Sequence, residues 1–233
     1  MKLSIIIPAL NEASAIEKTL SQLHSLRNEA EFEIIVSDGG SCDKTVELAR
    51  RYSAVVQGEK GRGAQLNLGA RHASGRVFFF VHADMVVPKG ALMEIMQKIE
   101  IEGFDGGGFS NVFSTHNRKI KRLGRIMNLR FLNNDHAGNL TFFGDNGIFV
   151  RREAFESLGG FKQIPIMEDY DFSKRMRDRF RVVRIENPKL IVSPRRHIEA
   201  GFFQTRFQWM AIKRLYQLGV SPNFLAKLYK EVR

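Results

Sequence analysis

RVFFFVHADMVVPKG, residues 76–90, begins with an apolar run that ends directly at His82, Ala83 and Asp84. The segment VFFFV, 77–81, has the length and composition of a strand that is buried on both faces of a sheet. A carboxylate that is buried without a partner costs several kcal/mol. We therefore expect Asp84 to meet a cation, a cluster of hydrogen-bond donors or a ligand at the end of this strand.

Length and composition are those of an ordinary globular protein. The chain has 233 residues, of which 43% are hydrophobic and 26% charged, enough for one sizeable core. Its single cysteine excludes an internal disulfide framework and fits a reducing compartment. The first apolar run is too short for a signal peptide, and no run reaches the length of a spanning helix. These features predict a cytoplasmic protein, either free or peripheral at the inner face of the membrane.

The positive charge lies in the second half of the chain. Residues 1–116 hold 12 Lys or Arg against 14 Asp or Glu, a balance of −2, whereas residues 117–233 hold 24 against 11, a balance of +13. Such a basic half predicts an anionic partner, which is a phosphorylated ligand, an anionic lipid or a nucleic acid. The chain contains no recognised nucleic-acid-binding motif, so nucleic acid is not among the expected partners.

Strands and helices alternate around the opening segment. Strands are predicted at 3–7, 32–36, 54–56 and 77–81, with helices between them that begin near residues 14, 43 and 61 and a further helix after Pro88. Pro8 is expected to end the first strand, and Ser14 with Glu17 to form a capping box. Short apolar strands that alternate with helices predict an α/β protein with a mostly parallel sheet covered by helices.

The second half has a less regular pattern. Residues 105–110, DGGGFS, are glycine-rich, and residues 119–132 predict a basic helix. Residues 139–152 predict a strand, a turn and a second strand, and a helix beginning near Glu168 carries Phe172, Met176 and Phe180 on one face. The tail from Phe202 is aromatic, basic and helical in pattern. With no repeat or linker, residues 1–233 are predicted to form one domain.

Polar clusters follow four of the predicted strands, as PALNE, SDGGS, GEKGRG and HAD. Ligands of open α/β sheets bind beyond the carboxyl ends of the strands, where these clusters would meet. Asp38 and Gly39 suit a base or ribose, whereas Arg62 and Gly63 at a helix start suit phosphate. Asp84 suits Mg²⁺ or Mn²⁺ against a diphosphate. Each cluster alone is also ordinary turn chemistry.

In this order, SIIIPALNE, SDGGSCDKT, GRGAQLNLGARHASG and FFFVHAD resemble the nucleotide-binding half of family 2 glycosyltransferases of the GT-A fold. The similarity continues through GDNGIFVRREAFESLGGF and IMEDYDFSKRMR, so it covers most of the chain. It implies a mostly parallel central sheet flanked by helices, with a helical C-terminal extension. Residues 1–115 would bind the nucleotide sugar, residues 116–201 would form the acceptor and catalytic half, and residues 202–233 would be the basic, aromatic tail.

The resemblance also implies roles in the donor site. Residues that would contact the nucleoside are Pro8, Asn11, Glu12 and Asp38. The Asp-x-Asp element of the family aligns with His82-Ala83-Asp84, so Asp84 would bind the metal that bridges the diphosphate. His82 would contact ribose or serve the structure, with metal binding as the alternative. Arg195 and Arg196 would neutralise the diphosphate and His197 would be a further metal ligand, unless this segment is a solvated basic turn.

On the acceptor side, Gly144 and Asp145 would lie near the incoming hydroxyl, although Asp-Asn-Gly is also good β-turn chemistry. By resemblance, Asp169 would be the general base and Glu168 its support. Without the resemblance, both carboxylates would simply complement a helix dipole, which would lower the pKa of Asp169.

The resulting hypothesis is a metal-dependent, inverting glycosyltransferase that uses a nucleoside-diphosphate sugar and a hydroxyl acceptor, which is a saccharide, a lipid-linked molecule or a small molecule. Two alternatives are nucleotidyl transfer on a related sheet and a non-catalytic module that binds nucleotide or membrane. For the tail, packing against the sheet or a dimer contact is favoured over an anionic membrane surface, which would suit a lipid-linked acceptor.

Overall fold

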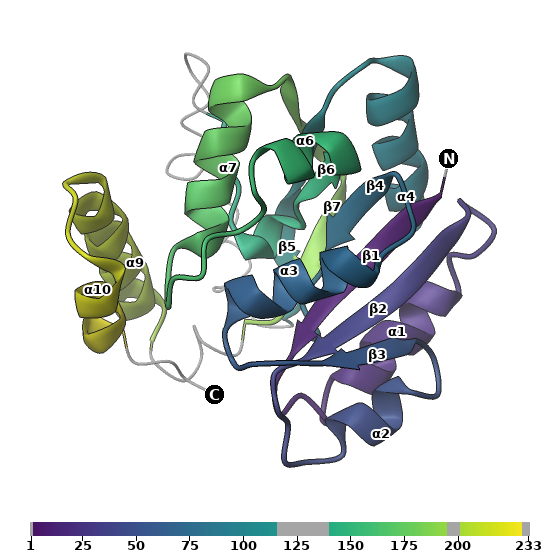
Figure 1. The fold of residues 1–233 in the computed structure, drawn as a ribbon, viewed down its shortest axis with the longest axis horizontal. Helices are drawn as coiled ribbons and strands as arrows, with labels where there is room; N and C mark the ends of the chain where they lie inside the picture. The colour runs from purple at the N-terminus through teal and green to yellow at the C-terminus, as the bar shows by residue number, and fades with distance from the viewer. Residues whose placement is uncertain (1, 116–139, 195–200, 230–233) are drawn as a thin grey trace.

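The computed structural model describes residues 2–115, 140–194 and 201–229. These residues include a seven-stranded sheet with the order β3-β2-β1-β4-β6-β5-β7 (Figure 1). Only β6 runs against its neighbours, so the sheet is mostly parallel, as predicted. The strands are β1 (Leu3–Ala9), β2 (Phe32–Asp38), β3 (Ala54–Gln57), β4 (Val77–Phe80), β5 (Gly106–Phe113), β6 (Phe149–Arg151) and β7 (Val182–Val192).

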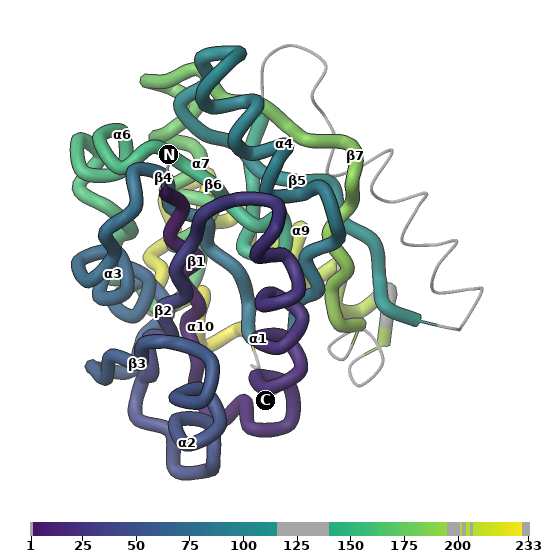
Figure 2. Tube along the Cα trace, turned by 90° about the vertical axis from the view of Figure 1, so that its right-hand side faces the viewer, coloured from purple at the N-terminus to yellow at the C-terminus, as the bar shows by residue number. Residues whose placement is uncertain are grey.

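Helices cover both faces of this sheet. One face is covered by α1 (Ile16–His24), α2 (Thr45–Ala49) and α4 (Ala91–Met96), and α4 continues as a π-helical turn through Ile101. The other face is covered by α3 (Arg62–His72), α6 (Arg152–Ser157) and α7 (Glu168–Arg179). Figure 2 shows α1 and α3 on opposite sides of β1. The predicted α/β class with helix-covered layers is therefore confirmed.

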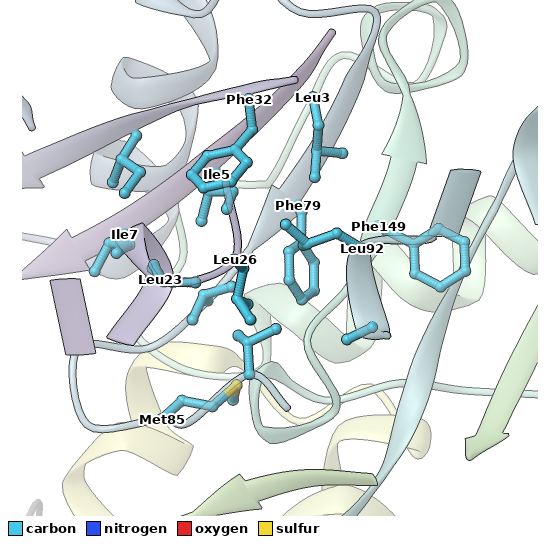
Figure 3. Packing of buried hydrophobic residues seen from close by; sticks show 14 of the residues in the cluster. Leu3, Ile5, Ile7, Leu23, Leu26, Phe32, Phe79, Met85, Leu92 and Phe149 are labelled. Atoms are coloured by element: carbon cyan, nitrogen blue, oxygen red, sulfur yellow. The ribbon is translucent and has the colours of Figure 1, made fainter. Parts of the chain in front are cut away.

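The phenylalanine run of the opening segment fills both layers. Phe79 packs with α1 and α4, where Leu3, Ile5 and Leu92 surround it (Figure 3). Phe78 and Phe80 point the other way, and Phe78 meets Phe155 edge-on with 5.3 Å between ring centroids. Because successive side chains alternate between faces, a strand that is buried on both sides needs a continuous apolar run.

Two local predictions at the first strand are wrong. Pro8 does not end β1, because the strand continues to Ala9 with Pro8 opposite Ser37 of β2. The pairing of β1 with β4 stops at Ile6, so the nitrogen of Pro8 faces a position where no ladder bond is needed. Ser14 and Glu17 form no capping box, since α1 begins at Ile16 without a side-chain cap.

The second half adds one strand that the sequence analysis did not assign and departs from the predicted pattern at one place. Gly106, Gly107 and Gly108 lie inside β5, where a Cβ on Gly107 would stand 2.0 Å from the Val183 carbonyl oxygen. Because these glycines have no side chains, β5 can lie this close to its neighbour β7 and to the ring of Phe142. Residues 140–143 form no strand, so the predicted strand, turn and strand reduce to a 3-10 turn at Gly144–Asn146 followed by β6. The predicted basic helix at 119–132 lies outside the described residues.

The tail forms two helices, α9 (Phe202–Gln217) and α10 (Pro222–Leu228). Ile212 and Leu225 are buried together with Ile166, Met167 and Tyr170, which lie just before and within the start of α7. One side of the tail therefore packs on the start of α7 and the residues before it, whereas the sequence analysis favoured packing against the sheet or a dimer contact. Among the described residues, no helix combines the length and apolar character that crossing a bilayer requires.

Candidate active site

The site lies at the carboxyl edge of the central strands. Residues Pro8 and Ala9 of β1 stand opposite Ser37 and Asp38 of β2, and the amide of Val81, just after β4, donates to the Ile6 carbonyl. The loops after β1, β2 and β4 consequently open at the same edge. This is the arrangement that the four polar clusters predict.

The loops after β1 and β2 are tied into one unit. The backbone N–H of Asn11 donates to Ser41 Oγ over 2.9 Å, and Asn11 Oδ1 accepts from the Cys42 amide over 2.9 Å. The Glu12 amide donates to Thr45 Oγ1 over 2.8 Å. Asn11 has a positive φ of 54°, a conformation that asparagine tolerates better than most residues. Asn11 therefore shapes the loops of the predicted nucleoside site through its backbone and its side chain, and Glu12 through its backbone.

Asp38 is fully buried at the end of β2. Its Oδ2 accepts the amides of Gly40 and Ser41, each over 3.0 Å, and its Oδ1 accepts the Ser41 hydroxyl. In this structure the carboxylate organises the turn that follows β2. Its predicted contact with base or ribose stays a prediction.

Gln65 of α3 is a site residue that the sequence analysis missed. Its side chain is buried, and Nε2 donates to the carbonyl oxygens of Ala9 over 2.7 Å and of Ser37 over 3.0 Å. A Cβ on Gly39 would stand 2.9 Å from this amide, so glycine is required for the close approach. The signal in the sequence is a glutamine one turn into the helix that follows GEKGRG.

Arg62 and Gly63, which are predicted to bind phosphate, lie against Glu168, the residue next to the predicted base. Arg62 Nη1 lies 3.3 Å from Glu168 Oε1, and the Glu168 side chain is only 3% exposed. A Cβ on Gly63 would stand 2.5 Å from the Lys162 carbonyl oxygen and 3.7 Å from the Cβ of Glu168. The start of α3 and the start of α7 are therefore in close contact, although about a hundred residues separate them along the chain.

Asp169, the predicted base, is buried at the first turn of α7. Its Oδ2 accepts the Gly144 amide over 2.7 Å, and its Oδ1 accepts the Tyr170 amide over 2.6 Å. Burial, together with the negative charge of Glu168, raises the pKa of Asp169 to about 7 against the opposing effects of Arg62 and the two amides. The expectation that the helix dipole would lower this pKa is therefore wrong, because desolvation outweighs the favourable groups.

A small hollow brings the predicted donor, acceptor and base residues together. A Cβ on Gly144 would stand 2.2 Å from His82 Nε2 and 3.4 Å from Asp169 Oδ2, so both side chains face this glycine. A glycine here leaves room that any larger residue would occupy. The residues that line the hollow are Pro8, Arg62, Leu66, Phe80, Val81, His82, Gly144, Ile148, Phe161 and Asp169.

Asp145 is not among these lining residues, and it is exposed. Its backbone carbonyl accepts from Asn111 Nδ2 over 2.8 Å, while Asn146 donates to the Phe109 carbonyl and accepts the Phe143 amide. These hydrogen bonds fix the turn at residues 144–146, GDN, so that the Gly144 amide donates to Asp169. The role of Asp145 toward an acceptor stays a prediction.

The metal prediction depends on Asp84, which is partly buried two residues beyond His82. Within the described ranges, no group of three or more His, Cys, Asp or Glu side chains is arranged to hold a metal ion. One carboxylate nevertheless fits Mg²⁺ or Mn²⁺, which commonly take one or two protein carboxylates and complete their shell with phosphate and water oxygens. Arg195, Arg196 and His197 lie outside the described residues.

The start of α7 is held by a frame of residues that the sequence analysis also missed. Met167, directly before Glu168, is buried with a positive φ of 71°. The ring of Tyr170 stacks on Phe143 with 5.6 Å between centroids, and Tyr216 of α9 donates to Asp171 Oδ1 over 3.1 Å. A non-glycine residue in this conformation costs about 1–3 kcal/mol, so the surrounding contacts must maintain it. They fix the direction in which Asp169 points.

The chain is thus an open α/β protein whose candidate ligand site lies beyond the carboxyl ends of parallel strands. Comparison with known sequences then defines the family. Residues 4–159, more than half of the chain, match the family described as glycosyl transferase family 2, and the chain belongs to that family.

The similar proteins are longer than this chain. Glycosyltransferase AglE of Haloferax volcanii is 27% identical over 187 residues, which is 75% of this chain and 61% of that protein. Dolichol-phosphate mannosyltransferase of Pyrococcus furiosus is 32% identical over 107 residues, which is 43% of this chain and 30% of that protein. The matched part of the chain therefore spans 61% of the length of the first relative and 30% of the second.

Among solved structures, the mannosyltransferase PcManGT of Pyrobaculum calidifontis, in complex with GDP-Man and Mn²⁺, superposes with a TM-score of 0.67. The identity is 22%, and the match covers 99% of this chain and 65% of that one. At this identity the likeness shows a shared fold, and the expected GT-A fold is confirmed.

Proposed function

We propose that this protein transfers a sugar from a nucleoside-diphosphate donor to an acceptor hydroxyl, with Asp169 as the general base. The observation that carries the proposal is the placement of Asp169, buried in the hollow beside His82, Gly144 and the Arg62–Glu168 ion pair. Its pKa of about 7 suits a base that must accept a proton near neutral pH. Family membership favours sugar transfer over nucleotidyl transfer and over a non-catalytic module.

In the proposed reaction the acceptor oxygen attacks the anomeric carbon while its proton passes to the Asp169 carboxylate. The bond between that carbon and the diphosphate oxygen breaks, and the nucleoside diphosphate leaves with the electron pair. A single displacement inverts the configuration at the anomeric carbon. Glu168, held by Arg62, keeps a negative charge beside Asp169 and so favours proton uptake.

The donor would lie across the carboxyl edge of β1, β2 and β4. Arg62 at the start of α3 would contact the diphosphate, and Pro8, Asn11, Glu12 and Asp38 would form the nucleoside side. A divalent cation held by Asp84 would neutralise charge on the diphosphate. Because the solved relative contains GDP-Man and Mn²⁺, Mn²⁺ is the first metal to test.

Calorimetric titration with UDP, GDP and their sugar conjugates, with and without Mn²⁺ or Mg²⁺, tests the donor site. We expect one nucleotide to bind in a metal-dependent manner, and Asp84→Ala to weaken this binding by about tenfold or more, since even supporting residues of metal sites contribute tenfold or more to affinity. Asp178→Ala, an exposed carboxylate on α7, is the control and should bind normally. Failure of every nucleotide to bind the folded protein would contradict the proposal.

The pH dependence of transfer tests the pair around the base. Asp169 must be ionised to accept the proton, so kcat/KM should rise with pH through about 7. Glu168→Gln removes the neighbouring negative charge, lowers the pKa of Asp169 and should move this rise to lower pH. Arg62→Gln removes the opposing cation and should move it to higher pH. Shifts in the same direction for both variants would show that these charges do not act on the base.

A further inference from the structure

The outer side of the tail carries an unusual concentration of exposed apolar side chains. Seven large hydrophobic residues are strongly exposed in the described part of the chain, and five of them belong to α9, α10 or the residue after α9. Phe207, the most exposed of the five, is 76% accessible. The five, which we call the apolar face, are Phe207, Met210, Leu218, Phe224 and Leu228.

The spacing of these residues places them opposite the side of α9 that packs on the protein. Positions 207, 210, 214 and 218 follow one another by three, four and four residues, which is one stripe along a helix. Ile212, buried on the inner side, lies roughly half a turn away from this stripe. Gln208 Nε2 donates to the Leu228 carbonyl over 2.9 Å, so the start of α9 and the end of α10 lie together.

The positive charge around the apolar face indicates which kind of partner would bind there. Residues 201–229 contain four Lys or Arg and no Asp or Glu. Arg214 lies within the exposed stripe of α9, and Lys227 is exposed beside Phe224 and Leu228 on α10. A second copy of this chain would bring like charges against each other. An anionic lipid surface accepts both the apolar side chains and the cations.

We propose that the apolar face docks the protein onto a bilayer that contains anionic lipid, with Phe207, Met210 and Leu218 entering the interface and Arg214 and Lys227 contacting headgroups. Figure 1 shows α9 and α10 at one flank of the molecule, beyond α7 and away from β1–β3. The inner side of the same two helices packs on Met167 and Tyr170, the residues that flank Glu168 and Asp169. About one helix diameter, on the order of 10 Å, thus separates the docking face from residues beside the proposed base.

The closeness of the apolar face to Asp169 also indicates an acceptor class, an inference that rests on the proposed function. A docked protein would hold its base close to the membrane surface, where a lipid-linked hydroxyl would reach it. The acceptor class that fits is therefore a hydroxyl carried on a lipid anchor.

Co-sedimentation with sucrose-loaded vesicles tests the docking directly. The full chain is mixed with vesicles of phosphatidylcholine alone and of an equal mixture of phosphatidylcholine and phosphatidylglycerol. We expect binding to the anionic vesicles, a loss of about tenfold or more in the partition coefficient for Phe207→Gln/Met210→Gln, and a similar loss for Arg214→Gln/Lys227→Gln. The matched apolar control is Met93→Gln/Ile101→Gln, at two large hydrophobic residues that are strongly exposed outside the tail, and Arg50→Gln/Arg71→Gln is the matched charge control.

The proposal is overturned if the unaltered chain does not bind anionic vesicles, or if the control pairs reduce binding as much as the tail pairs. It is also overturned if Phe207→Gln/Met210→Gln dissociates a dimer while vesicle binding is absent, because a second copy would then cover the face. Titration of each variant with nucleotide in the absence of vesicles reports on the donor site separately. Nucleotide binding without vesicle binding would refute the docking alone, and vesicle binding without nucleotide binding would refute the proposed function alone.

Discussion

Asp169→Asn is expected to lower kcat for sugar transfer by about 10²- to 10⁴-fold, because a positioned general base contributes a factor of this size. The substitution keeps the volume of the side chain and one acceptor for the amides of Gly144 and Tyr170. It removes the group that takes the proton from the acceptor hydroxyl. Donor binding should persist, since Arg62 and the loops after β1 and β2 are unchanged.

Single-turnover transfer and nucleotide titration on the same preparation separate these effects. Asp178→Asn makes the same chemical change near the other end of α7, at an exposed position, and should leave kcat unchanged. In Asp169→Asn one of the two backbone amides loses its acceptor, which could destabilise the fold. Circular dichroism and thermal unfolding therefore check that the variant is folded. A folded variant with full kcat would refute Asp169 as the base.

Phe79→Ala is expected to lower the free energy of unfolding by about 3–5 kcal/mol, the range for removing a buried aromatic ring. Phe79 is fully buried among side chains from α1, α4 and the neighbouring strands (Figure 3). Its ring lies 5.7 Å from that of Phe109 and also contacts the position where a Cβ of Gly147 would stand. Helices on both faces limit how far the core can collapse into the space left behind.

Urea unfolding followed by fluorescence and circular dichroism measures this loss as a shift of the transition midpoint. Phe207→Ala is the matched control, since the same change at a 76% exposed position should shift stability by no more than about 0.5 kcal/mol. Equal shifts for the two variants would mean that the VFFFV strand does not form the core described here.

The fold was predictable because its signals are local. The apolar run at 77–81, the alternation of strands and helices and the polar clusters after the strands each depend on neighbours in the sequence. Predictions failed where a distant neighbour decides the outcome. Pro8 reads as a strand end until the pairing of β4 is known to stop at Ile6. The sequence analysis assigned no structure to Gly106–Gly108, whose place in β5 becomes clear only when β7 and Phe142 are set against it.

Some residues of the candidate site could be chosen from the sequence and others could not. Its acidic and glycine residues were chosen from the sequence and the family resemblance, and the structure brings Pro8, Arg62, His82, Gly144 and Asp169 around one hollow. Gln65, Tyr170 and Tyr216 were not chosen, because a glutamine or a tyrosine in a helix carries no sign of what it touches. Their contacts lie far from them along the chain.

Local sequence pattern was enough to place carboxylates at strand ends and helix starts, since side-chain periodicity and turn chemistry act over a few residues. The pKa of Asp169, in contrast, depends on the folded chain as a whole. Its position at a helix start favours an ordinary, ionised acid, yet burial by segments from three parts of the chain raises its pKa to about 7. Desolvation depends on everything that surrounds a group in space, so no local sequence pattern predicts the raised pKa of Asp169.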